Sequence, residues 1–406
     1  MALAHTNLQI LPLSTEMKHN QSQLHRRPRI CFVVAVPGTA LSFLCDHIQQ
    51  LSHHYDVYLA VGHCDPAAIA PLAIKGYKMC GINRNISPLD DIRAIYQLSR
   101  YFSKMHFDAV HSVTPKAGMI TAIAAKIARI PHRIHIFTGQ VWAGRKGPMR
   151  ALLKSIDKII ASLDNHILVD GASQRQYLID NKVLRPGAAR VLAHGSICGV
   201  NTSRFNPDPQ TAAAVRAEMG ITPERTVFAF MGRLNRDKGL FELLTAFNTL
   251  AETDHNAFLL LIGNDEENIT ATFDNYHNIC PGYNFLFFGP TSNPGRTLQA
   301  ADIFVIPTYR EGFGSSVIEA SCLALPVITS DTYGVLDAAI DGVTGLRCKV
   351  ADVPSLLHAM TRLAADPHLR HTLGANGRQR ILSDFTAQVV TNAWLDYYRG
   401  ILPGEH

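Results

Sequence analysis

Two glutamates, Glu311 and Glu319, flank a glycine-rich segment in the second half of the chain. The residues between them that concern this segment are Gly312, Phe313, Gly314, Ser315 and Ser316. A helix is expected to begin near Ser315 or Ser316, where free backbone N–H groups and small residues favour a closely approaching anion. The carboxylates could accept hydrogen bonds from sugar or ribose hydroxyls, although two glutamates near a helix start are more often only solvated. The segment therefore predicts a site for a phosphate-bearing sugar compound.

A basic cluster follows an expected strand at 226–231. It contains Gly232, Arg233 and Lys238. Two cations at the carboxyl end of a strand can neutralise the charge that develops on a departing diphosphate, and a solvated basic loop is the alternative. The chain has no Asp-x-Asp triplet, which is the usual way of presenting carboxylates to a metal-bound nucleotide diphosphate. We therefore expect phosphate binding without a metal and without a cofactor.

Both clusters need strands and helices that place them at one edge of a sheet. The apolar run at 30–36, the break at 37–39 and the amphipathic stretch at 41–51 predict a strand, a turn and a helix. Similar strand-like runs recur at 56–61, 109–112, 133–137 and 166–169, separated by helical segments. This alternation predicts an α/β protein with parallel sheets covered by helices on both faces.

The alternation pauses once and then begins again at residue 226. We divide the chain into a flexible tail (1–28), an N-terminal domain (29–200), a connection (201–225), a C-terminal domain (226–384) and a C-terminal helix (385–406) that crosses back to the N-terminal domain. A length of 406 residues suits two domains of this size. Two Rossmann-like, doubly wound domains would face a central cleft, which is where open α/β sheets bind ligands.

The two clusters also match a known sequence pattern. The chain reads G-R-x(4)-K-G at 232–239, E-G-F-G-x(4)-E-A at 311–320, P-V-I at 326–328 and D-G-x-T-G at 341–345. This combination resembles the GT-B retaining glycosyltransferases of the glycogen-synthase-like group. The resemblance implies that Glu311 contacts the donor sugar, Glu319 holds the nucleotide ribose, and Arg233 and Lys238 bind the diphosphate. It also implies a UDP-sugar donor more than a GDP-sugar, and a leaving phosphate that itself accepts the acceptor's proton.

The first half is similar to bacterial members that extend undecaprenyl-diphosphate-linked glycans for surface polysaccharide. The similarity lies in the segments 111–118, 133–142 and 195–205. It implies that His135 lies near the transferred carbon, although a histidine that ends an apolar strand is more often a core residue. The residues that it assigns to the acceptor are Gly38, Thr39, Lys116 and Gly118. Many relatives carry a Gly-Gly pair where this chain has Pro-Gly-Thr at 37–39, so the donor-phosphate contact there is weakened or replaced.

The charge is unevenly distributed along the chain. Residues 1–200 carry a net charge of +12, and the remaining residues carry −7. A basic half suits an anionic partner such as a phosphate-bearing substrate or a membrane surface. The helix expected at 148–163 combines basic and aliphatic residues, so it could lie on an anionic membrane, or it could be a core helix with a basic outer face. Nucleic acid is not expected as a partner, because the chain shows no aromatic-interleaved basic stripe.

The sequence also indicates a compartment. It contains no uncharged apolar stretch of about 18 residues, and its first 28 residues do not have the pattern of a signal peptide. The eight cysteines form no C-x-x-C pair, which fits a reducing environment. We therefore expect a cytoplasmic protein that associates peripherally with the inner face of the membrane.

Other function classes are excluded or stay open. The chain lacks G-x-x-x-x-G-K-[ST], G-x-G-x-x-G after its first strand, G-x-S-x-G and H-E-x-x-H. The absence of these motifs argues against NTPases, ordinary dinucleotide dehydrogenases, esterases and zinc proteases. Two alternatives to the transferase remain, a nucleotide-sugar epimerase on the same scaffold and a non-catalytic subunit that only binds.

Overall fold

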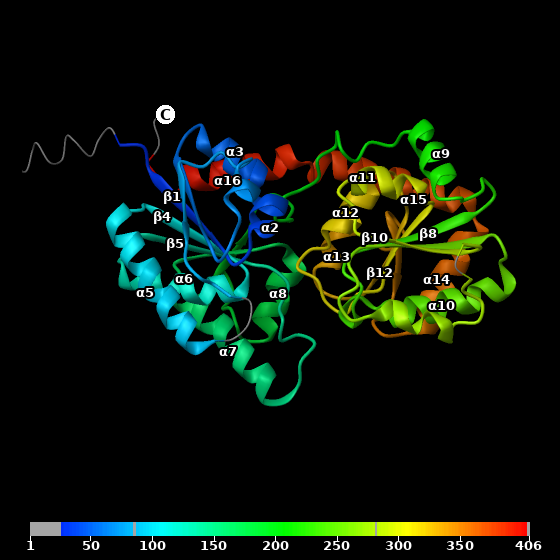
Figure 1. Cartoon of the computed structure of the whole chain (residues 1–406), viewed down its shortest axis with the longest axis horizontal. Coiled ribbons are helices and arrows are strands. Elements are labelled where there is room, and N and C mark those ends of the chain that lie inside the picture. Colours follow the sequence, from blue (N-terminus) through cyan, green and yellow to red (C-terminus); the bar gives the residue numbers. More distant parts are fainter. Residues whose placement is uncertain (1–25, 84–86, 281, 404–406) are drawn as a thin grey trace, which may run out of the picture.

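Two parallel β-sheets form the centres of two domains that lie side by side (Figure 1). The computed structural model describes residues 26–83, 87–280 and 282–403, so the expected tail at 1–28 lies almost entirely outside the described residues. The first sheet has the order β3-β2-β1-β4-β5-β6-β7, and the second has the order β10-β9-β8-β11-β12-β13. In both, the chain starts in the middle, builds outward to one edge and then returns to build the other half.

The strands of the first sheet are β1 (Arg29–Val34), β2 (Asp56–Val61), β3 (Gly76–Met79), β4 (Ala109–Val113), β5 (His132–Phe137), β6 (His166–Val169) and β7 (Ala189–Val191). Those of the second are β8 (Thr226–Met231), β9 (Ala257–Ile262), β10 (Phe285–Gly289), β11 (Ile303–Ile306), β12 (Val327–Ser330) and β13 (Gly345–Cys348). The central strands β1, β8, β9 and β11 are almost wholly buried, because helices cover both faces of each sheet. The continuous apolar runs of the sequence therefore predicted these strands correctly.

Helices pack on both faces of each sheet (Figure 1). Those that follow strands of the first sheet are α2 (Pro37–Thr39), α3 (Cys45–Ser52), α4 (Pro66–Ile69), α5 (Pro88–Met105), α6 (Pro115–Ile127), α7 (Gly147–Leu163) and α8 (Ala172–Asp180). Later in the chain come α9 (Pro209–Glu218), α10 (Leu240–Thr253), α11 (Pro294–Thr297), α12 (Ser315–Cys322), α13 (Val335–Ala338), α14 (Val353–Ala365), α15 (Pro367–Asp384) and α16 (Ala387–Arg399). A π-helical turn at Ala40–Leu44 joins α2 to α3, so the first helix begins directly after β1.

The segment expected to be a connection, 201–225, contains the helix α9. The Asp208 side chain accepts hydrogen bonds from the N–H groups of Gln210 and Thr211, and Pro209 occupies the first helical position. A capping aspartate followed by proline starts a helix, so the segment expected as a connection contains a helix of its own. Arg216 of α9 forms an ion pair of 2.6 Å with Asp302, which fixes α9 on the second domain.

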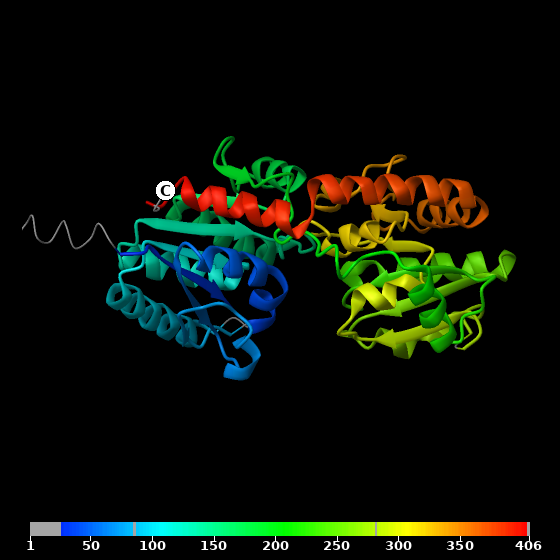
Figure 2. The ribbon, with the colours of Figure 1, turned by 90° about the horizontal axis from the view of Figure 1, so that it is seen from above.

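The helix α16 returns to the first domain and packs beside α3 (Figure 2). Its Trp394 ring stacks on two buried histidine rings, with ring centroids 4.3 Å from that of His47 and 4.9 Å from that of His111. His47 bonds to the Ile197 carbonyl at 2.7 Å and to the Thr391 hydroxyl at 2.9 Å. Burial lowers the pKa of His47 to about 4 and that of His111 well below its usual value, so both imidazoles are neutral near pH 7.

The first prediction concerns the stability of this contact in acid. An unfolded chain takes up a proton on His47 near pH 6.5, whereas the folded chain resists protonation until about pH 4. The free energy of unfolding should therefore fall as the pH drops from 6.5 to 4, by up to about 3 kcal/mol from this group. Urea unfolding of wild type and His47→Gln across this range measures the effect, which should be smaller in the variant. The exposed His63→Gln is the control, and equal slopes in all three proteins would contradict the account.

Candidate active site between the two domains

The two sequence clusters meet at one edge of the second sheet. Strand order reverses between β8 and β11, and ligands of open α/β sheets bind outside the carboxyl ends of strands at such a point. The segment 232–238 follows β8, and the segment 307–315 follows β11. Residues about 75 positions apart in the sequence therefore become neighbours because they follow neighbouring strands.

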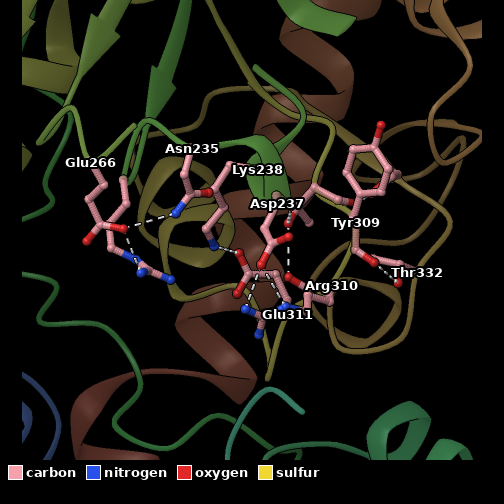
Figure 3. Close-up of polar contacts among 11 residues, drawn as sticks. Asn235, Asp237, Lys238, Glu266, Tyr309, Arg310, Glu311 and Thr332 are labelled. Atoms are coloured by element: carbon pink, nitrogen blue, oxygen red, sulfur yellow. Dashed lines mark hydrogen bonds and ion pairs between the residues drawn. The ribbon is translucent and has the colours of Figure 1, made fainter. Parts of the chain in front are cut away.

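An ion pair joins the two loops at this edge (Figure 3). Lys238 Nζ donates to Glu311 Oε1, and the two side chains are only 15% and 17% exposed. The neighbouring Arg310 forms two hydrogen bonds to Asp237 Oδ2, at 3.0 and 2.7 Å. The Tyr309 amide donates to the Asp237 carbonyl at 2.9 Å. These contacts set the positions of Lys238 and Glu311 before any ligand is bound.

Arg233 lies in a different part of the same edge. Its guanidinium contacts Glu266 at 2.9 Å, and Asn235 donates to the same carboxylate oxygen at 3.1 Å (Figure 3). The Arg233 side chain is 54% exposed, so it has room to turn toward an anion. Gly232 precedes it directly after β8. Arg233 therefore lies at the same edge of the sheet as Lys238, where it pairs with Glu266.

The loop after β11 ends in the helix α12. Gly314 is its N-cap, with a φ of 92°, which is the left-handed region that favours glycine. Ser315 and Ser316 occupy the first helical positions and no side chain caps this end, so the first amides are available to an anion. Phe313 instead turns inward, where it is 2% exposed and packs on the Phe385 ring at 5.3 Å. Phe313 therefore fixes the loop to the protein core through its contact with Phe385.

Glu319 lies in the second turn of α12. Burial raises the pKa of its carboxyl group to about 7, and the nearby Arg204 opposes this shift. Arg204 follows the 195–201 segment, so Glu319 faces the chain that joins the two domains. A carboxyl group with this pKa exists in both protonation states near neutral pH, and its neutral form can donate a hydrogen bond as well as accept one.

The expected acceptor residues lie after β1 and β4, where the strand order of the first sheet reverses. Gly38 and Thr39 form the first turn of α2, and a Cβ on Gly38 would meet no atom within 4 Å. Thr114 caps α6 with a φ of 75°, an unfavourable conformation for a β-branched residue. Lys116 follows it and forms an ion pair of 2.5 Å with Asp91 among its interactions.

His135 and Gly118 lie together inside the first domain. The His135 ring is wholly buried, bonds to the Ser112 hydroxyl at 2.8 Å and packs against the backbone of α6 at Gly118. Burial lowers the pKa of His135 to about 3. The described contacts of His135 do not include the loop of Glu311. The segment after β5 that reaches that loop is 138–140, since a Cβ on Gly139 would lie 3.1 Å from the Gly312 nitrogen.

Asp170, which directly follows β6, was not among the site residues expected from the sequence. Its carboxyl group is 3% exposed, and its Oδ2 atom would lie 2.6 Å from a Cβ on Gly312. Its Oδ1 atom is buried without a hydrogen-bond partner among the described residues. Burial, together with the negative charge of Glu311, raises the pKa of Asp170 to about 8. The sequence signal that could have revealed Asp170 is its position directly after a strand, at the same edge of the first sheet as the expected acceptor residues.

Within the described ranges (26–83, 87–280 and 282–403), no group of three or more His, Cys, Asp or Glu side chains is arranged to hold a metal ion. No helix in these ranges is both long enough and apolar enough to cross a bilayer.

Two doubly wound domains that meet at the carboxyl ends of their strands define the GT-B class of glycosyltransferase folds. The structure of Anabaena HepE in complex with UDP-glucose shows the same fold, with a TM-score of 0.75 and 16% identity over 92% of this chain and 99% of that one. Residues 212–380 match the family model "Glycosyl transferases group 1". The chain therefore carries a domain of this glycosyltransferase family.

Two relatives match most of the chain. The capsular polysaccharide biosynthesis glycosyltransferase CapM of Staphylococcus aureus is 29% identical over 309 residues, which is 76% of this chain and 81% of the relative. An Escherichia coli protein is 22% identical over 316 residues, covering 77% of this chain and 80% of its own. Its name is UDP-Gal:alpha-D-GlcNAc-diphosphoundecaprenol alpha-1,3-galactosyltransferase. These matches extend into the first domain, beyond the range of the family model.

The second prediction concerns the buried carboxyl group of Asp170. The unfolded chain ionises this group near pH 4, whereas the folded chain keeps it protonated until about pH 8. Its contribution to stability therefore becomes less favourable as the pH rises from 4 to 8. Asp170→Asn cannot ionise, so it should be more stable than wild type at pH 8 by at least about 1 kcal/mol, with a smaller difference at pH 5. Urea unfolding at both pH values is the measurement, and a destabilised variant at pH 8 would contradict it.

Proposed function

We propose that this protein is a retaining glycosyltransferase that moves a hexosyl or N-acetylhexosaminyl group from a UDP-sugar to a lipid-diphosphate-linked glycan. The observation that carries the proposal is the half-buried Lys238–Glu311 pair beside the uncapped start of α12. A cation and free amides at one point suit a diphosphate, and an adjacent carboxylate suits the hydroxyls of a sugar. The names of the relatives supply the acceptor class and the role in surface polysaccharide synthesis.

The donor would bind to the second domain. Its diphosphate would lie at the amides of Ser315 and Ser316, within reach of Lys238. Arg233 would leave Glu266 and turn to the same diphosphate, for which its exposure leaves room. Negative charge that develops on the leaving diphosphate would then meet two cations and a helix start, so the barrier to bond cleavage would fall. Glu319 would hold the ribose, and Glu311 the transferred sugar.

The acceptor would bind to the first domain at the edge formed by Gly38, Thr39 and Lys116. Closure of the two domains would exclude water, which would otherwise intercept the activated sugar. No group of this chain is assigned as a covalent nucleophile, so the leaving phosphate would take the proton of the acceptor hydroxyl on the face that it vacates. His135 and Gly118 would support the acceptor helix α6 from inside the domain, because the His135 ring packs against it.

The test is release of nucleoside diphosphate from a panel of UDP- and GDP-sugars, with and without membranes that contain lipid-diphosphate glycans. Acceptor-dependent release, with the anomeric configuration of the product determined by NMR, would support the proposal. An isomerised sugar nucleotide without release would indicate the epimerase instead. The absence of both nucleoside diphosphate release and donor isomerisation over the whole panel would indicate a non-catalytic subunit.

The third prediction concerns the loss of the half-buried Lys238 cation. Lys238→Ala removes the positive charge nearest to the diphosphate and leaves Glu311 without its partner. We expect kcat to fall about a hundred-fold or more, the usual effect of losing one group that stabilises transition-state charge. Lys349→Ala, an exposed lysine of the same domain, is the matched control and should keep the wild-type rate. A Lys238→Ala protein with nearly normal turnover would contradict the assigned role.

The acceptor class requires contact with a membrane, and we assign this contact to α7. Only Asp157 and Ile160 of α7 are buried, whereas Met149, Leu152 and Ile159 are 43–51% exposed. Exposed basic residues accompany them on α7 and on the turn before it, at Arg145, Lys146 and Lys158. Aliphatic side chains that enter the headgroup region, flanked by cations that meet anionic lipid, are typical of helices that lie on a membrane. The protein would thus work at the cytoplasmic face of the membrane.

The fourth prediction tests this surface. Replacing Lys146 and Lys158 by glutamine should weaken binding to vesicles of anionic lipid about thirty-fold, at about 1 kcal/mol per charge, with binding to neutral vesicles unchanged. The control replaces two exposed basic residues of the second domain, Lys349 and Arg362, by glutamine. Vesicle co-sedimentation at fixed ionic strength is the measurement. Equal losses in both double variants would assign binding to net charge alone and remove the role of α7.

A further inference from the structure

A column of three stacked aromatic rings crosses from the first domain to the second. The Trp142 ring lies 5.4 Å from that of Tyr177 in α8, with 15° between their planes. Tyr177 in turn lies 4.0 Å from Tyr333, at 12°. Tyr333 belongs to the second domain, in the loop between β12 and α13. Trp142 is 1% exposed and Tyr333 is 8% exposed, so the column is buried at both ends.

The first-domain end of the column is fixed to α7. The Trp142 indole N–H donates to Asp157 Oδ2 at 2.7 Å, and Asp157 is a buried residue of α7. The cations of Arg150 and Lys154, also in α7, lie 5.2 and 5.6 Å from the centre of the Trp142 ring. Hydrogen bonding and two cation–π contacts therefore hold the ring against the helix assigned to the membrane.

The second-domain end lies against the loop that carries Glu311. The residue after Tyr333 is Gly334, where a Cβ would lie 2.7 Å from the Glu311 carbonyl oxygen and 2.8 Å from that of Gly312. The Tyr333 hydroxyl accepts a hydrogen bond of 3.3 Å from the backbone N–H of Gln140, in the first domain. A shift of Tyr333 would therefore carry the backbone of the Glu311 loop with it.

Hydrogen bonds of α8 add to this contact between the two domains. The Gly334 amide donates to the Ser173 hydroxyl at 2.8 Å. Asp337 Oδ2 accepts from the Ser173 amide at 2.8 Å and from its hydroxyl at 2.7 Å. Ser173 lies in the first turn of α8, where unpaired amides favour a carboxylate. One residue of α8 thus binds both Gly334, at the end of the loop after β12, and Asp337 in α13.

We infer that Tyr177 and Tyr333 are positioning residues for sugar transfer: their stack holds the loop of Glu311 against the first domain in the closed arrangement. The inference rests on the proposed function for its consequence in catalysis, but the contact itself exists without a ligand. Neither ring is assigned to a substrate, so both act through Glu311 and the closure of the cleft. Through Trp142 the column also ties the closed arrangement to α7.

The first arm of the test needs no substrate. Tyr333→Leu and Tyr177→Leu remove the stack, and Tyr333→Phe and Tyr177→Phe keep the ring. Small-angle scattering of the full chain should give a larger radius of gyration for both leucine variants, because the domains separate, and the wild-type radius for both phenylalanine variants. Equal radii for the leucine variants and wild type would overturn the inference.

The second arm measures turnover with the donor that the panel identifies. Tyr333→Leu should lower kcat about two- to twelve-fold, the range expected from the loss of one aromatic pair, with unchanged affinity for UDP. Tyr177→Leu should lower kcat at least as much, because it also removes the contact with Trp142. The loss in the double variant should be smaller than the sum of the two single losses on the free-energy scale, because both single variants remove the Tyr177–Tyr333 contact. Additive losses, or a loss of UDP affinity in place of kcat, would overturn the inference.

A matched pair inside the first domain separates positioning from stability. Tyr101 and Phe107 are in edge contact at 5.3 Å and lie away from the domain contact. Tyr101→Leu should lower the midpoint of thermal unfolding and leave both the radius of gyration and kcat unchanged. An equal fall in kcat in this control would show that the leucine variants act through general destabilisation. A wild-type protein without turnover would contradict the proposed function, while the scattering arm would still decide the role of the column.

Discussion

The ion pair between Lys238 and Glu311 is the interaction on which the site depends. Its two side chains come from loops that follow different strands, and both are largely withdrawn from water. A charge in such a place needs a partner, since an unpaired one would be strongly destabilising. Folding of the second sheet brings the two together, because β8 and β11 are adjacent. A ligand that carries its own negative charge and hydroxyl groups can take over both halves of this pair without leaving either charge unsatisfied.

The rest of the architecture brings a second surface to that pair. The strands of both sheets direct their following loops toward the contact between the domains, which places 138–140 and Asp170 beside Gly312. The chain crosses between domains twice, before α9 and again before α16. After the second crossing, Trp394 stacks on His47 and His111, which fixes α16 on the first domain. Two crossings restrict the relative motion of the domains to a limited set of directions.

Sequence predicted the parts of this molecule that local patterns specify. Continuous apolar runs gave the buried strands, and a glycine-rich loop before a helix gave α12, because both depend on neighbouring residues. The residue types of Lys238 and Glu311, placed after strands, were enough to expect them at one site. The helix that Asp208 and Pro209 begin was not predicted within 201–225, because the same residue types serve both turns and helix starts. The packing of His135 beneath α6 depends on Gly118 and Ser112, and the column of Trp142, Tyr177 and Tyr333 joins rings that are far apart in sequence; no local pattern reveals either.

The contact between the domains combines groups that stabilise it with one that does not. The aromatic column and the Ser173–Asp337 hydrogen bonds favour closure, whereas Asp170 lies beside Glu311 with one oxygen unpaired. A second carboxyl group near Glu311 makes the empty closed state less stable, since either a proton must be held or two negative charges must face each other. A bound sugar could relieve this by offering hydroxyl groups to the free oxygen. On the proposed function, a bound sugar would therefore add to the stability of a closed arrangement that the aromatic column already favours without a ligand.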